Sequence, residues 1–96
     1  MKTITASDLK SKLEAKESIQ IIDIRENFEF EDGSMTDLNV PMDDLANDTS
    51  SINKNEKVVI VCQTGRRASA LIYILEKKYS LDNLYCLEGG YEAYIK

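Results

Sequence analysis

Short apolar segments alternate with amphipathic ones along this chain. Segments rich in isoleucine, valine and leucine, bounded by polar or turn residues, are typical of buried strands. The expected strands are residues 2–5, 19–25, 38–41, 58–62 and 83–87. The segment 38–41 ends at Pro41, which cannot donate to a sheet ladder. The pattern therefore predicts a sheet of about five short strands.

A helix is expected over residues 5–16, directly after the first strand. Thr5 is suited to cap it, and Asp8 lies three residues later, in the capping-box position. Ile4 and Leu9 have the spacing of a hydrophobic staple across that cap. These signals fix where the helix begins.

The strongest helix signal covers residues 66–79. Its apolar positions repeat as expected for one buried face, namely Ala68, Leu71, Ile72, Leu75 and Tyr79. Lys77 and Lys78 fall near its C-terminus, where cations complement the helix dipole. Shorter helices are expected from about Asp43 and within residues 88–96. The stretch 26–37, punctuated by Gly33, is expected to be a polar turn.

Strands that alternate with helices indicate an α/β fold, with a mainly parallel sheet covered by helices on both faces. The chain has 96 residues, of which 43% are hydrophobic and 30% charged. A chain of this length forms one modest core, so residues 1–96 are expected to be a single domain.

Composition narrows the classes of function. The formal net charge of −5 disfavours nucleic acid as a partner. No stretch is long and apolar enough to cross a membrane, and the first ten residues have no signal-peptide core. The two cysteines do not resemble a secreted disulfide framework, which favours a cytoplasmic protein with reduced thiols. Histidine is absent, and neither a metal nor an organic cofactor is implied.

Polar and reactive residues follow three of the expected strands. Ligands of parallel sheets bind beyond the carboxyl ends of the strands. The residues at these ends are Asp23, Arg25 and Glu26 after the second strand, Cys62 after the fourth, and Glu88, Gly89 and Gly90 after the last. The three ends are expected to converge on one crevice.

The loop "CQTGRRA" (62–68) joins a buried strand to a helix N-terminus. Gly65 allows a tight curl, in which successive N–H groups point inward and stabilise an anion. A Cys62 thiolate at the centre would be an activated nucleophile that needs no histidine. Arg66 and Arg67 would attract an anionic substrate. The alternative, that Cys62 is only a small buried apolar residue, does not account for the glycine and arginines that follow.

Two phosphate-binding loops can be tested by counting. The P-loop pattern G-x-x-x-x-G-K-S/T is absent. A cysteine phosphatase loop of the C-x5-R type needs arginine at position 68, which is Ala68 here. Arg67 instead closes a C-x4-R loop, one residue short for phosphate, so phosphate or arsenate chemistry is disfavoured.

Four motifs together resemble the rhodanese-like (sulfurtransferase) family. "CQTGRR" resembles its active loop C-x-x-G-x-R, and "DIRENFEF" (23–30) resembles D-V/I-R-E-x-x-E-F/Y. "NVP" (39–41) is similar to N-I-P, and "LEGGYEAY" (87–94) to L-x-G-G-x-x-A-W. The motifs occur in family order and span nearly the whole chain. The family's usual histidine is Ser34 here and its closing tryptophan is Tyr94, which we interpret as a core substitution.

This resemblance implies a small rhodanese fold and a cysteine that carries sulfane sulfur as a persulfide. Cys62 would take sulfur from an anionic donor such as thiosulfate, or from a protein donor, and pass it to cyanide or a thiol. The backbone amides that would cradle the persulfide are those of Gln63, Thr64, Gly65, Arg66, Arg67 and Ala68. Arg67 matches the arginine that closes the family's loop. The alternative is a sulfur-carrier or regulatory binding module with little turnover of small molecules.

The remaining polar residues have more ordinary interpretations. Asp23, Arg25 and Glu26 are expected to form a structural network near the site, since a thiolate needs no proton relay. Cys86 could be a resolving thiol, but its place in a strand favours inert packing. The acidic stretch 26–32 is expected to be a solvated loop.

Overall fold

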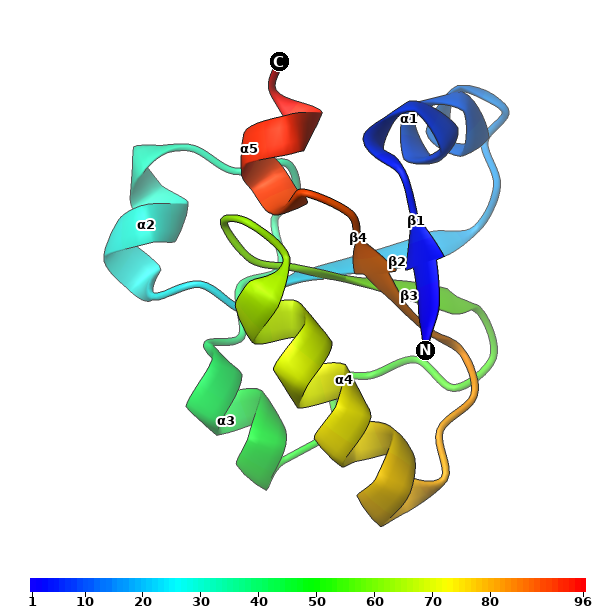
Figure 1. The fold of residues 1–96 in the computed structure, drawn as a ribbon, viewed down its shortest axis with the longest axis vertical. Helices are drawn as coiled ribbons and strands as arrows, with labels where there is room; N and C mark the ends of the chain where they lie inside the picture. Colours follow the sequence, from blue (N-terminus) through cyan, green and yellow to red (C-terminus); the bar gives the residue numbers. More distant parts are fainter.

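The computed structural model describes residues 1–96 and is built on a four-stranded, all-parallel sheet with strand order β1-β4-β3-β2 (Figure 1). The strands are β1 (Lys2–Ile4), β2 (Ile19–Asp23), β3 (Lys57–Val61) and β4 (Leu84–Leu87). The α/β class and the parallel sheet predicted from the sequence are confirmed. Because every strand runs in the same direction, all four carboxyl ends lie at one edge of the sheet.

Helices cover both faces of the sheet, as predicted. On one face α3 (Met42–Asn47) and α4 (Arg66–Tyr79) enclose the larger core cluster, to which α4 contributes Ala68, Leu71, Ile72 and Leu75. On the other face α1 (Ala6–Glu14) and α5 (Gly90–Tyr94) pack over a smaller cluster. No helix of the structure combines the length and apolar character needed to span a bilayer.

The capping and periodicity signals in the sequence correctly predicted two of the helices. Helix α4 has the bounds expected from its periodicity, and Thr5 caps α1 by accepting the Asp8 N–H at 3.0 Å. The prediction that Tyr79 shares the buried face is wrong, because 40% of its surface is exposed. Tyr79 lies in the last turn of α4, before the left-handed Ser80, and Lys78 covers its ring.

Two segments differ from the prediction. The expected strand 38–41 is reduced to a single bridge between Asp23 and Asn39. Backbone bonds still join the segment to the end of β2, since the Asp23 N–H donates to the Leu38 carbonyl and the Val40 N–H donates to the Asp23 carbonyl, both at 2.9 Å. The Asn39 side chain adds bonds to the carbonyls of Asp23 and Arg25. The stretch 26–37 is not a plain turn, because it contains the short helix α2 (Asn27–Asp32). No residue of α2 is buried, so no apolar periodicity marked it.

Candidate active site

The loop between β3 and α4 wraps its backbone around the sulfur of Cys62. The Sγ atom accepts the Gly65 N–H at 3.0 Å and the Ala68 N–H at 3.4 Å, and only 1% of the residue's surface is exposed. Gly65 has φ +97° and directly precedes the first residue of α4. Two of the six predicted amides thus point at the sulfur, and the helix N-terminus adds its positive end. The sulfur is therefore held by backbone N–H groups at the start of α4.

Helix α5 holds the loop from the other side. The Tyr91 N–H donates to the Cys62 carbonyl at 2.8 Å, and the Glu92 N–H donates to the Gln63 carbonyl at 3.1 Å. Gly90 makes this close approach possible, since it has φ +63° and a Cβ there would lie 2.5 Å from the Cys62 oxygen. Gly90 therefore helps to position Cys62, although the two residues are far apart in the sequence.

A buried ion pair forms the wall behind the loop. Arg25 and Asp23 are 3% and 0% exposed, and Arg25 Nη2 lies 2.9 Å from Asp23 Oδ2. Arg25 also donates to Gln63 Oε1 at 3.0 Å and to the Gly33 carbonyl at 2.6 Å, while its guanidinium lies 4.4 Å from the ring centre of Tyr91. Through these bonds the ends of β2 and β3 and helix α5 are locked together. Such an arrangement suits the structural role expected for Asp23 and Arg25.

Arg67 forms a two-pronged ion pair with Glu29 of α2. Both N–O distances are 2.9 Å. The hydrogen bonds from Arg67 lower the pKa of Glu29 from its usual 4.5 to about 2, and Glu29 in turn raises the pKa of Arg67. The interpretation of residues 26–32 as a merely solvated loop is therefore wrong for Glu29. Its signal was present in the sequence, as the last glutamate of the "DIRENFEF" motif.

The other predicted residues lie at the rim. Arg66 and Thr64 are exposed, and Arg66 has no carboxylate within ion-pair distance. Glu26 is exposed and precedes α2, where its N–H donates to Glu29 Oε1 at 3.1 Å. It takes no part in the Asp23–Arg25 pair. The three residues predicted as one network thus divide into a buried pair and a helix-starting residue.

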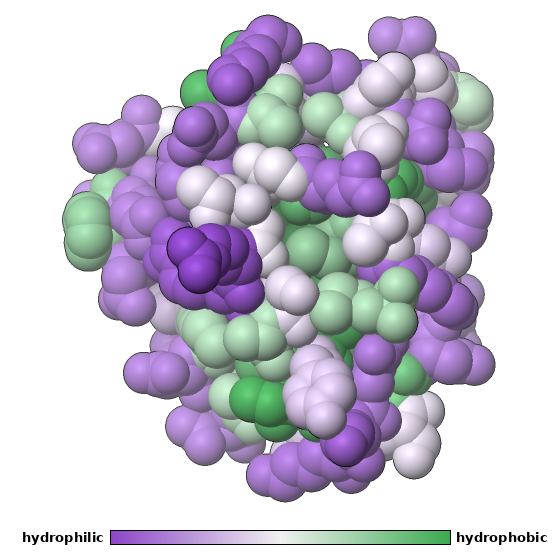
Figure 2. Space-filling model, viewed as in Figure 1, coloured by the Kyte–Doolittle hydropathy of each residue, from purple (hydrophilic) through white to green (hydrophobic).

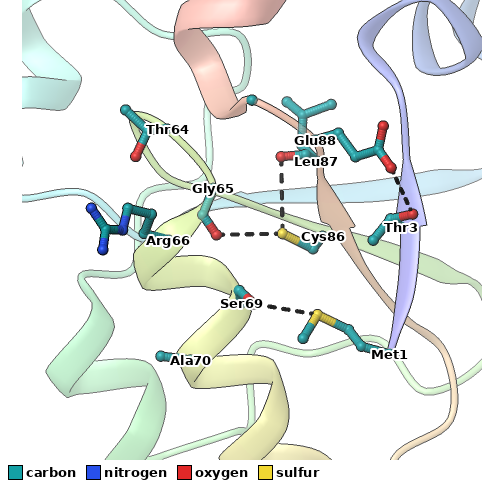
Figure 3. Close-up of a pocket in the computed structure, with 11 residues that line it drawn as sticks. Met1, Thr3, Thr64, Gly65, Arg66, Ser69, Ala70, Cys86, Leu87 and Glu88 are labelled. Carbon is teal, nitrogen blue, oxygen red and sulfur yellow. Dashed lines mark hydrogen bonds between the residues drawn. The ribbon is translucent and has the colours of Figure 1, made fainter.

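Two concave surfaces flank the loop. The larger, of about 530 Å³, lies between α4 and the β1–β4 edge and is lined by Thr64, Gly65 and Arg66 of the loop together with Met1, Thr3, Ser69, Ala70, Cys86, Leu87, Glu88 and Gly89 (Figure 3). The smaller, of about 240 Å³, is lined by Arg25, Glu29, Asp32, Gly33, Gln63 and Tyr91. The loop contributes Gln63 to the smaller surface, and Cys62 lines neither of them.

Cys86 contributes to the floor of the larger cavity. Its thiol points at the Gly65 carbonyl, with an S–O distance of 3.5 Å (Figure 3). Burial raises the pKa of the Cys86 thiol, and the charge of Cys62 raises it further. Both cysteines are free thiols. No group of three or more histidine, cysteine, aspartate or glutamate side chains is placed to hold a metal ion.

Comparison with known proteins agrees with this geometry. The family model described as "Rhodanese-like domain" matches residues 5–96. The Bacillus subtilis (strain 168) protein named "Putative sulfurtransferase YtwF" is 29% identical over 96 residues, which cover 98% of this chain and 90% of that protein. "Putative sulfur carrier protein YrkF" from the same strain is 26% identical over 76 residues, which cover 78% of this chain and 41% of that protein. The crystal structure of a rhodanese-like domain protein from Staphylococcus aureus superposes with a TM-score of 0.87 at 35% identity, covering 98% of this chain and 91% of that one.

Proposed function

The chain belongs to the rhodanese-like domain family, and from that premise we propose that it is a sulfurtransferase that carries sulfane sulfur as a persulfide on Cys62. One observation carries the proposal. The Cys62 sulfur accepts two backbone N–H groups at the N-terminus of α4, an arrangement suited to hold a negatively charged sulfur. The sulfurtransferase and sulfur-carrier names of the relatives support the same chemistry.

The first step loads the enzyme. The Cys62 thiolate attacks the outer sulfur of a donor such as thiosulfate, and the donor's sulfur–sulfur bond breaks. Sulfite leaves with the bonding electrons, and Cys62 keeps one extra sulfur as a persulfide anion. The amides of Gly65 and Ala68 are already in place to stabilise this anion, so little reorganisation is needed.

The second step unloads it. An acceptor, either cyanide or a thiolate, attacks the outer sulfur, and Cys62 leaves as the thiolate that began the cycle. In this proposal Cys62 is the catalytic residue, the backbone of residues 63–68 holds the persulfide, and the buried Arg25–Asp23 pair keeps the crevice in shape. Neither step uses a metal or an organic cofactor. We place the reaction in the cytoplasm because it needs free thiols, and both cysteines are free.

The test is intact mass of the reduced protein after a sulfur donor and then after cyanide. Thiosulfate and cysteine persulfide are used in parallel. We expect a gain of one sulfur atom that cyanide removes. Cys62→Ser should lose this gain and Cys86→Ser should keep it, which would assign the sulfur to Cys62. A Cys62→Ser protein that loads and transfers sulfur at the wild-type rate would refute the proposal.

A second candidate is a sulfur carrier that receives its sulfur from a protein and turns over small molecules poorly. The 1% exposure of Cys62 favours it, because a recessed sulfur is hard for a free small molecule to reach. Rapid loading from a cysteine desulfurase, combined with slow loading from both small donors, would support the carrier role. Fast turnover with a small donor would exclude it.

A further inference from the structure

We propose that the exposed face of helix α2, centred on Phe28, docks a protein whose surface is basic around an apolar pocket. We call this the α2 face and define it by Glu26, Phe28, Glu31 and Asp32. It lies outside the Cys62 loop, and its binding does not depend on the sulfur chemistry proposed for that loop. Two features carry the proposal, an aromatic side chain left in solvent and a segregation of charge along the chain.

Phe28 is the most exposed of the large apolar side chains. Of its surface 67% is exposed, against 60% for Ile95 and 59% for Met1. Phe28 belongs to neither core cluster, and the helix that carries it has no buried residue. An aromatic ring at position 28 therefore adds little to the packing of the fold. Aromatic residues are enriched among the residues that dominate protein interfaces, because they bury a large apolar area there.

Charge is strongly segregated along the chain. Residues 26–53 contain eight of the 17 acidic residues and none of the 12 basic ones, so this segment has a formal charge of −8. The rest of the chain contains 12 basic and nine acidic residues and has a formal charge of +3. Among the acidic residues of the segment, only Glu29 lies within ion-pair distance of a cation. The other seven carboxylates are not neutralised by the protein itself.

Many of these carboxylates gather around the α2 face and the start of α3. The exposed ones on the two helices and their caps include Glu26, Glu31, Asp32, Asp43 and Asp44. The helices begin near one point, because the Met42 N–H at the start of α3 donates to the Ile24 carbonyl, shortly before α2. Figure 1 shows α2 and α3 on the same side of the molecule. In Figure 2, viewed in the same direction, a green group at the left edge stands among purple atoms, where Figure 1 places α2.

Charge complementarity identifies the occupant of this face. Its carboxylates attract a basic surface, and they repel nucleic acids and anionic membranes. A second copy of the chain is disfavoured, because a symmetric contact would bring two faces of the same negative charge together. A protein with lysine or arginine around an apolar pocket complements both the carboxylates and Phe28.

A partner on the α2 face would stand next to the Cys62 loop. Glu29, the neighbour of Phe28 in sequence, is bonded to Arg67 in the first turn of α4 through two bonds of 2.9 Å. Glu29 and Asp32 also line the smaller concave surface, together with Gln63 of the loop. A protein interface of ordinary size covers about 800 Å² of each partner. Such an interface centred on Phe28 would extend to this concave surface.

The experiment uses a defined probe in place of the partner. The probe is a fluorescent peptide of about 14 residues, lysine and leucine, arranged as an amphipathic helix. Two matched peptides carry serine for each leucine or glutamate for each lysine. We expect the lysine–leucine peptide to bind the protein roughly fivefold more tightly than either matched peptide, with an affinity that falls as salt rises. Equal binding of the lysine–serine peptide would show that charge alone acts, and would overturn the proposal.

Two variants and two matched controls locate the binding, which is measured by fluorescence anisotropy. Phe28→Ser should weaken binding of the lysine–leucine peptide by roughly fivefold or more, as for a central interface residue. Ile95→Ser removes a similarly exposed apolar side chain outside the acidic segment and should leave the affinity unchanged. Glu31→Gln should weaken binding by roughly twofold and reduce its dependence on salt. Glu14→Gln removes an exposed carboxylate from α1 and should do neither.

The outcomes separate docking from the sulfur chemistry. If Phe28→Ser binds the peptide as tightly as Ile95→Ser does, the docking role of the α2 face is refuted. Self-association of the wild type in sedimentation velocity, abolished by Phe28→Ser, would show that a second copy covers the face and would also overturn the proposal. Phe28→Ser should still load sulfur from thiosulfate as the wild type does, because Phe28 lines neither concave surface. If no sulfur is loaded on the wild type while the peptide binds as expected, the proposed function fails and the docking site stands.

Discussion

Replacing Gly90 by alanine should disturb the nucleophile without touching any reactive group. A Cβ at position 90 would lie 2.5 Å from the Cys62 oxygen and 2.6 Å from the carbonyl carbon and oxygen of Gln63. Ordinary contact begins near 3.4 Å, so the overlap is 0.9 Å (3.4 − 2.5). The atoms it meets are backbone, which cannot rotate away as a side chain does. The loop that holds the Cys62 sulfur must therefore shift.

The cost can be estimated from separate causes. An L-residue in the left-handed region at φ +63° costs about 1–2 kcal/mol. Overpacking against a rigid neighbour costs about 1–3 kcal/mol. The expected loss of unfolding free energy is thus about 2–5 kcal/mol. A domain of this size has a stability of roughly 5–14 kcal/mol, so the variant should remain largely folded at low temperature while its loop is displaced.

Two measurements test this reasoning. Urea unfolding at pH 7 gives the loss of stability, and the rate of persulfide formation on Cys62 reports the loop. Gly33→Ala is the matched control, because Gly33 also has positive φ but its Cβ would meet only the Tyr91 hydroxyl at 3.0 Å, the end of a side chain. We expect the control to cost about 1 kcal/mol and to load sulfur normally. If Gly90→Ala cost no more than the control and loaded sulfur as fast, the backbone clash would not govern the loop.

Three further predictions concern charge and capping. The pKa of Glu29 is lowered from 4.5 to about 2 by Arg67, so the pair stabilises the fold above pH 4.5 and this contribution is lost as pH falls toward 2. Because Arg67 is 37% exposed, Glu29→Gln should lower the free energy of unfolding by only about 1 kcal/mol at pH 7, measured by urea unfolding. The difference from wild type should vanish near pH 2, and an equal difference at both pH values would contradict this. Arg25→Ala should cost about 3–5 kcal/mol in the same assay, since it leaves the buried Asp23 carboxylate unpaired, and a loss below 1 kcal/mol would show that water replaces the guanidinium. Thr5→Ala should lower the thermal midpoint through loss of about 1 kcal/mol of helix capping, whereas Thr5→Ser should be near wild type.

Local sequence patterns predicted those parts of the fold that local physics determines. Helix α4 carries its own apolar face, and four of its five predicted core positions are buried. Helix α2 has no buried apolar face. Its position is fixed by the bond between Glu29 and Arg67, which are 38 residues apart in the chain. The expected strand around Asn39 keeps a single bridge to Asp23, and bonds from the Asn39 side chain to Asp23 and Arg25 supplement it, which apolar content alone cannot reveal.

The candidate site shows the same division. The cysteine, the glycine and the helix start of the loop are local, and together they predicted the cup around Cys62. Whether each arginine forms an ion pair cannot be predicted from its neighbours in the sequence. Arg66 and Arg67 are neighbours in sequence and look equivalent there, yet one is exposed and the other is neutralised by Glu29. The electrostatic character of the site therefore depends on that distant partner.

The pairing of β1 with β4 has a consequence for how the chain acquires its structure during synthesis. β1 has no other strand neighbour, and its residues pair across the chain, with Lys2 opposite Tyr85 and Ile4 opposite Leu87. Contacts so distant in sequence form slowly, because a long loop must close before they are gained. Helix α5, which anchors the Cys62 carbonyl through Tyr91, also follows β4. On the ribosome, therefore, the bonds that hold the Cys62 loop from the side of α5 cannot form until residues 84–94 have emerged.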